Sequence, residues 1–111
     1  MRRTLLLLGG LILVPPAAAA QENGDPVAGG AFAGEACASC HATQPRETTS
    51  PKAAHPNAPA FQQVADTPGM TGIALTVWLQ TSHPTMPNLQ LTPVESRDVI
   101  AYILSLRTRR E

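Results

Sequence analysis

The chain has few aromatic residues, few cysteines and almost no lysine, and each shortage excludes a class of protein. Only four of its 111 residues are aromatic, and Lys52 is the single lysine. Its formal charges cancel, and it has no basic stripe that would neutralise nucleic-acid phosphates or bind an anionic membrane. Two cysteines allow at most one disulfide, so a disulfide framework cannot stabilise the domain. We therefore expect no nucleic-acid partner.

An apolar stretch near the N-terminus is short for a membrane-spanning helix. Residues 5–20 are mostly apolar, but they include two adjacent prolines and follow two arginines, whereas a spanning helix needs about 20 apolar residues. A positive start, an apolar centre and small residues at the end are the layout of a secretory signal peptide. We expect residues 1–20 to be a signal peptide, residues 21–111 to be one domain, and the mature protein to be periplasmic. A retained membrane anchor is the alternative.

The spacing of apolar residues predicts short helices and no strands. We expect helical segments at residues 26–38, 61–65, 71–81 (with Thr71 as its N-cap) and from Pro93 onward. Irregular loops that contain proline are expected at residues 42–60 and 84–91. A small domain with eleven prolines needs a disulfide framework, a metal or a cofactor for stability. Because there are only two cysteines, a large apolar cofactor would fill this need.

The clearest helix signal lies near the C-terminus. Thr92 is expected as the N-cap, with Pro93 at the first helical position and Glu95 completing a capping box. The buried face of this helix is expected to consist of Val99, Ile100, Ile103, Leu104 and Leu106. Three arginines are expected to interact with the negative end of its dipole: Arg107, Arg109 and Arg110.

The residues Cys37-Ala38-Ser39-Cys40-His41 carry the strongest functional signal. The pattern C-x-x-C-H is the attachment motif of c-type haem. Two thiols three residues apart lie on the same side of one tight turn, where each can add to one vinyl group of the same porphyrin. His41 then lies under the iron, for which an imidazole nitrogen is a good ligand. We therefore predict one haem c bonded to Cys37 and Cys40.

Three other interpretations of this motif remain open. A thioredoxin-like redox pair follows a β-strand and opens a helix, whereas this motif closes a helical stretch. A zinc site needs four ligands, and Cys37, Cys40 and His41 supply three. The cysteines can also be merely buried, or bridged to each other. The export signal favours haem, because c-type attachment is expected outside the cytoplasm.

A second axial ligand is expected from a proline-rich loop. Residues 83–87 read His-Pro-Thr-Met-Pro, and the prolines fix φ and leave few backbone states. This suits a loop that holds Met86, a weak thioether ligand, at a set distance from the iron. Met70 begins a helical segment, where its side chain can simply pack. His55 and His83 are further candidates, and either would give a lower reduction potential than methionine.

These residues give the chain a resemblance to the small class I (His/Met) cytochromes c of bacteria, over residues 27–107. The resemblance implies an all-α, class I cytochrome c fold, in which three to five short helices wrap around one covalently bound haem c. In that family a glycine of the first helix lets it cross the last helix closely, where an aromatic residue packs. Gly29 and Tyr102 match these positions. The alternative is that Gly29 belongs to a flexible pair with Gly30.

The resemblance also implies roles for two residues beside the haem. In the family, a proline carbonyl in the loop after the motif accepts a hydrogen bond from the ligand histidine, which orients the imidazole and raises its basicity. Pro59 matches this proline, and Pro56 is the alternative. Trp78 either donates its indole N–H to a haem propionate or packs in the core. Relatives that dock through a ring of lysines differ from this chain, so weak apolar contact around the haem edge is expected instead.

The expected function is a single-electron carrier with His41 and Met86 on the iron, and not an enzyme. We expect redox partner proteins to bind transiently through a small interface, and we expect no small-molecule substrate. The protein is expected to be a monomer or a subunit of a larger redox complex, where it would be the electron relay of a periplasmic dehydrogenase or oxidase. A peroxidase or gas-binding haem protein is a further alternative, which requires Met86 off the iron and His83 as the acid–base group.

Overall fold

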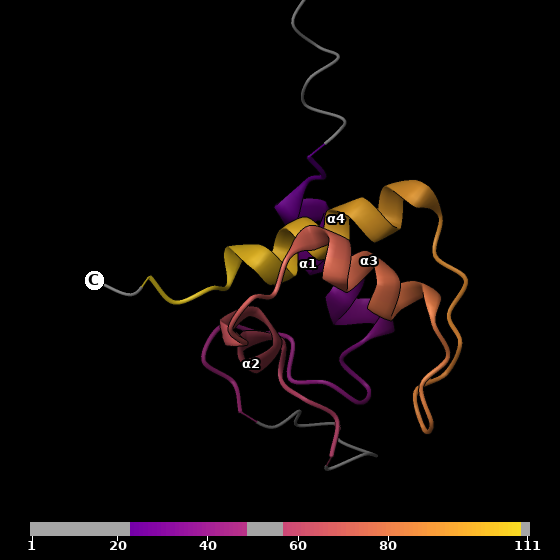
Figure 1. Cartoon of the computed structure of the whole chain (residues 1–111), viewed down its shortest axis with the longest axis horizontal. Helices are drawn as coiled ribbons and strands as arrows, with labels where there is room; N and C mark the ends of the chain where they lie inside the picture. Colours follow the sequence, from indigo (N-terminus) through magenta and orange to yellow (C-terminus); the bar gives the residue numbers. More distant parts are fainter. Residues whose placement is uncertain (1–22, 49–56, 110–111) are drawn as a thin grey trace, which may run out of the picture.

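Four helices make up the regular structure of the chain. The computed structural model describes residues 23–48 and 57–109, and these residues contain four helices and no strand. The helices are α1 (Pro26–Ala36), α2 (Phe61–Asp66), α3 (Gly72–Gln80) and α4 (Pro93–Ser105). In Figure 1, α4 runs through the middle of the molecule, and each of the other three helices contacts it. The predicted all-α class is therefore confirmed, whereas the predicted signal peptide at residues 1–20 lies outside the described residues.

The helices begin where polar caps stand in the sequence. The Asp25 carboxylate accepts hydrogen bonds from the first-turn N–H groups of α1, and Thr71 Oγ1 accepts one from Ala74 N–H at the start of α3. At the start of α4, Thr92 Oγ1 accepts from Glu95 N–H (3.2 Å) and the Glu95 carboxylate accepts from Thr92 N–H (2.8 Å). The predicted N-caps of α3 and α4 are thus confirmed. Helix α1 ends at Ala36, two residues before the predicted end.

Helices α1 and α4 cross with their backbones in close contact. A Cβ atom added to Gly29 would lie 1.9 Å from the carbonyl oxygen of Asp98 and 2.9 Å from Tyr102 Cβ. The Asp98 carboxylate also accepts a hydrogen bond from Asp25 N–H at 2.7 Å, just before α1. The crossing implied for Gly29 and Tyr102 is confirmed, because only a residue without a side chain fits between the two helices at this distance.

The buried core is small and rich in alanine. The buried hydrophobic side chains of the described residues are Ala33, Ala42, Ala60, Phe61, Ala65, Leu75, Val99 and Ile103. Of the predicted apolar face of α4, Val99 and Ile103 are buried, and the other three residues are partly buried. Because burying a large aliphatic or aromatic side chain contributes only about 1.5–3 kcal/mol, these few side chains give the domain a modest apolar core.

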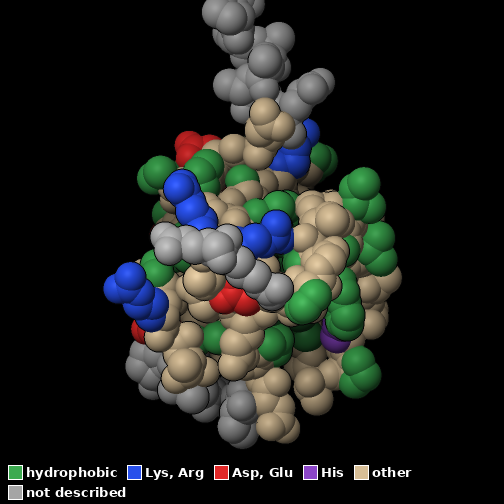
Figure 2. All heavy atoms as spheres, turned by 60° about the vertical axis from the view of Figure 1, so that its left-hand side comes forward, with side chains coloured by type: hydrophobic (Ala, Val, Ile, Leu, Met, Phe, Trp, Pro, Cys, Tyr) green, Lys and Arg blue, Asp and Glu red, His purple; other side chains and the backbone are tan. Residues whose placement is uncertain are grey.

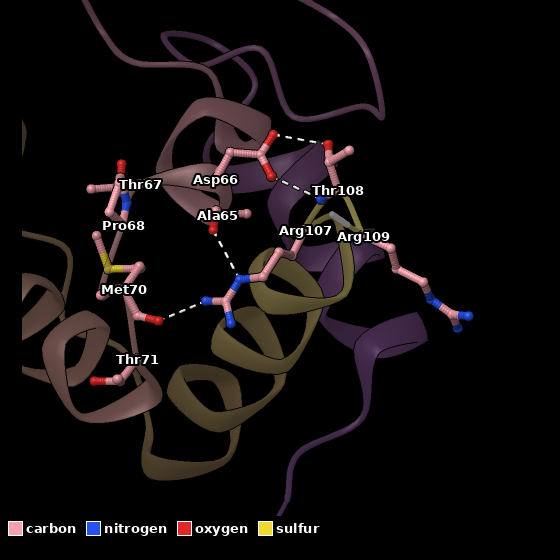
Figure 3. A pocket seen from close by; sticks show the side chains of 10 residues that line it. Ala65, Asp66, Thr67, Pro68, Met70, Thr71, Arg107, Thr108 and Arg109 are labelled. Carbon is pink, nitrogen blue, oxygen red and sulfur yellow. Dashed lines mark hydrogen bonds between the residues drawn. The ribbon is translucent and has the colours of Figure 1, made fainter. Parts of the chain in front are cut away.

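Arg107 does not have the role predicted for it. Helix α4 ends at Ser105 with no basic residue in its last turn. The guanidinium of Arg107 reaches back to two carbonyl groups elsewhere in the fold, donating from Nε to Ala65 O (3.1 Å) and from Nη2 to Met70 O (2.6 Å). Figure 3 shows this group pointing between the two carbonyls, and it shows Arg109 pointing away. Arg107 therefore connects the end of α2 and the segment just before α3 to the residues that follow α4.

Candidate functional site

The two cysteines and the histidine of the motif lie on one turn directly after α1. Cys37 caps the helix, and its carbonyl accepts hydrogen bonds from Cys40 N–H (3.1 Å) and His41 N–H (2.9 Å). Both cysteines are free thiols and are partly buried. The turn thus brings two thiols and one imidazole to the same end of α1, as the spacing predicts.

The surroundings of Cys37 disfavour a thiolate. Burial, followed by the neighbouring Cys40, raises the pKa of the Cys37 thiol to about 11. The position at the C-terminal end of a helix, where the dipole is negative, also opposes a negative charge. A thioredoxin-like pair needs the opposite environment, with a lowered thiol pKa at the start of a helix. The arrangement therefore argues against the redox-pair interpretation.

The His41 ring is oriented by a backbone carbonyl. His41 Nδ1 lies 2.7 Å from the carbonyl oxygen of Pro59. Because a carbonyl only accepts, Nδ1 carries a proton and donates it, which leaves Nε2 as the ring nitrogen that can bind a metal. The ring also contacts Phe61, with 5.3 Å between the ring centroids. Of the two candidate prolines, Pro59 makes this hydrogen bond, and Pro56 lies outside the described residues.

The loop that follows the motif is held on both sides. Phe61 N–H donates to Ala42 O at 2.9 Å, which joins the start of α2 to the residue after His41. On the other side, the Tyr102 hydroxyl donates to Thr43 O at 2.7 Å. Both Ala42 and Thr43 are buried. The backbone next to His41 is therefore fixed by α2 and by α4 at the same time.

Met86 lies on a tight reversal of the chain after α3. His83 and Met86 pair as an isolated antiparallel bridge, with Pro84 and Thr85 between them. Thr85 has φ 87°, a value that this turn position normally reserves for glycine or asparagine. Met86 is half-buried. Met70, by contrast, packs against the core cluster, and its carbonyl accepts the Arg107 hydrogen bond.

Comparison with known proteins identifies the family. The cytochrome c family model matches residues 27–107. The chain belongs to the cytochrome c family. It is 37% identical over 71 residues to cytochrome c-552 of Bradyrhizobium diazoefficiens, and the match covers 64% of each of the two chains. The chain thus spans less than two thirds of the length of this curated relative. No solved structure gives a significant match to the present chain.

The residues of this cytochrome fit the haem c of its family. Cys37 and Cys40 have the spacing of the attachment motif and are not bridged to each other. The hydrogen bond from Nδ1 leaves the second nitrogen of His41 available for a metal. Residues 23–48 and 57–109 contain no group of three or more His, Cys, Asp or Glu side chains that could hold a metal ion by themselves. The zinc interpretation therefore has no support from this part of the chain.

Trp78 lies away from the core of the cytochrome. Its side chain is 56% exposed, so the predicted alternative that it packs in the core is wrong. The indole stacks on the His83 ring, with 4.3 Å between centroids and 11° between planes. Sequence reasoning missed this contact, although the five-residue spacing across the end of α3 is a signal that could have suggested it. His55, a further candidate ligand, lies outside the described residues. None of the described helices is long and apolar enough to cross a membrane.

Proposed function

We propose that this cytochrome carries single electrons through one haem c, with His41 and Met86 as the axial ligands. The observation that carries the proposal is the hydrogen bond from His41 Nδ1 to Pro59 O (2.7 Å) beside two unbridged cysteines. It sets the tautomer and the orientation that an iron ligand needs. The haem supplies an iron that changes between two oxidation states, and the chain tunes its potential through the ligands.

The two ligand residues have different supports. The carbonyl partner of His41 raises the basicity of the imidazole without adding a charge. Met86 stands at the end of a turn in which Pro84 restricts φ and Thr85 is held at φ 87°. A thioether in this position gives a higher reduction potential than a second imidazole would. The hydrogen bonds beside His41 and the restricted φ values beside Met86 limit how far the backbone moves between the two oxidation states, which suits outer-sphere transfer.

We further propose that the protein is exported through a signal peptide at residues 1–20, acts in the periplasm and meets its redox partners transiently. On the face shown in Figure 2, basic side chains are scattered among hydrophobic and polar ones and form no ring. Exposed hydrophobic side chains are present on the described residues, with Ile73 81% and Val27 80% exposed. These features support weak apolar docking without strong electrostatic steering.

Visible and near-infrared spectra of the exported holoprotein test the axial ligands. Replacing Met86 by alanine should leave the haem attached, abolish the charge-transfer band of the methionine–iron bond in the ferric protein, and let the ferrous iron bind carbon monoxide. The matched control is Met70→Ala, which removes a packed methionine and should keep the band.

Three outcomes would contradict the proposed function. A band that survives in Met86→Ala and disappears in Met70→Ala would move the ligand to Met70. Carbon monoxide binding to the unmodified ferrous protein at neutral pH would favour an open iron and a peroxidase or gas-binding function. A colourless exported protein with a Cys37–Cys40 disulfide would refute haem attachment altogether.

A further inference from the structure

The turn that carries Met86 is attached to α3 through an aromatic stack. The rings of Trp78 and His83 lie 4.3 Å apart and are nearly parallel, at 11°. Trp78 is 56% exposed, so one part of the indole faces solvent while the other contacts the imidazole. His83 is the first residue of the turn, and Met86 is its antiparallel partner. The stack therefore bears directly on the backbone that places Met86.

The backbone of Trp78 is held in place because the end of α3 packs on the core and is capped by hydrogen bonds. On the inner side of the helix, Leu75 is buried and Leu79 packs against the core cluster. After the helix, the Thr81 hydroxyl donates to the carbonyls of Val77 (2.8 Å) and Trp78 (3.3 Å). These hydrogen bonds satisfy carbonyls that the end of a helix leaves without partners. The backbone of Trp78 is thus held by the packing of α3 on the core and by the hydrogen bonds of Thr81.

The turn itself stores conformational strain. Thr85 is β-branched and has φ 87°, a region that such residues rarely occupy. A turn with this strain opens unless contacts at its ends hold it closed. Two contacts hold this turn. The stack of Trp78 on His83 holds its first residue, and the bridge between His83 and Met86 joins its two ends.

We propose that Trp78 is a positioning residue for the sixth iron ligand, which holds the His83–Met86 turn closed by stacking on His83. The inference rests on the proposed function, in which Met86 binds the iron. It assigns Trp78 a role through its ring face, in place of donation from its indole N–H to a haem propionate. Loss of an aromatic pair of this kind changes an opening equilibrium roughly threefold to tenfold.

The test is the rate at which imidazole added to the ferric holoprotein replaces Met86, followed by loss of the methionine–iron band at one neutral pH. Trp78→Ala and His83→Ala should each speed the replacement roughly threefold to tenfold, and the double variant should be no faster than either single variant. Trp78→Phe keeps a ring face without the indole N–H and should stay close to the unmodified protein. Val77→Ala is the matched control, because it shortens an exposed side chain of the same helix without touching the stack.

The outcomes separate the possible failures. Equal effects of Trp78→Phe and Trp78→Ala would assign the role to the indole N–H and overturn the proposal. Additive effects of Trp78→Ala and His83→Ala, or unchanged rates in both, would also overturn it. If Met86→Ala leaves the ligation unchanged, the proposed function fails. If Met86→Ala opens the iron and the Trp78 variants exchange at the normal rate, only the positioning role fails.

Discussion

The close crossing of α1 and α4 at Gly29 can be tested with one methyl group. In Gly29→Ala, the new Cβ would lie 1.9 Å from the Asp98 carbonyl oxygen. Carbon and oxygen atoms in contact stand about 3.3 Å apart, so the two helices would have to separate by about 1.4 Å. The obstacle is backbone, which no change of rotamer can move aside. The substitution therefore disturbs the helix pair on which the rest of the domain packs.

The size of the effect follows from two opposing contributions. Overpacking costs about 1–3 kcal/mol, and a backbone obstacle puts Gly29→Ala at the upper end of this range. Alanine is favoured over glycine inside a helix by about 1 kcal/mol, which leaves a net loss of about 2 kcal/mol. Gly34 lies in the same helix, and a Cβ there meets nothing within 4 Å. Gly34→Ala should therefore gain about 1 kcal/mol.

The difference between the two variants isolates the crossing, because helix propensity is common to both. We expect the free energies of unfolding to differ by about 3 kcal/mol, from denaturant titrations of the holoproteins followed by circular dichroism. In thermal unfolding, Gly29→Ala should melt roughly 10 °C lower than the unmodified protein, since about 4–8 °C corresponds to 1 kcal/mol in a domain of this size. If both substitutions stabilise the protein equally, the helices do not approach closely at Gly29, and the reasoning is wrong.

Two further predictions concern side chains that tie α4 to its neighbours. Tyr102→Phe removes the hydrogen bond to Thr43 O and should cost about 1–2 kcal/mol in denaturant titrations. Burial, followed by the charge of Glu47, raises the pKa of Tyr102. The stabilisation that the neutral Tyr102 contributes is therefore complete below the usual tyrosine pKa and is lost as pH rises through the raised pKa. Tyr102→Phe should not show this loss of stability at high pH. Arg107→Lys removes the two hydrogen bonds to Ala65 O and Met70 O and should lower the free energy of unfolding by about 1 kcal/mol. The control Arg109→Lys should change the melting temperature little.

The features that could be predicted from the sequence are those set by residues close together in the chain. Thr92 and Glu95 satisfy each other across three positions, so the start of α4 follows from local chemistry. The turn that gathers the two cysteines and His41 spans five residues, and the spacing of the motif is sufficient to define it. Gly29 needed the family resemblance, because its partner on α4 lies far away in the sequence.

The features that could not be predicted depend on contacts between distant segments. The dipole argument placed Arg107 at the end of α4, whereas its guanidinium binds carbonyls 42 and 37 positions earlier. The stack of Trp78 on His83 requires that α3 end at Gln80 and that the chain reverse at Thr85. That reversal uses a positive φ at a β-branched residue, which turn statistics assign to glycine. Local rules therefore gave the right elements and missed how the Met86 turn is held.

The two proposed ligands depend on different parts of the fold, and this separates stability from ligand exchange. The backbone beside His41 is held by α2 and by Tyr102 of α4, so it loosens only when the helices around α4 separate. The Met86 turn is held by a stack on an exposed side chain of α3, so it can open while α1 and α4 stay packed. Local openings of this kind have lower free energies than global unfolding. The rate at which Met86 is released therefore reports the local opening of the turn, whereas the melting temperature reports the stability of the crossing between α1 and α4.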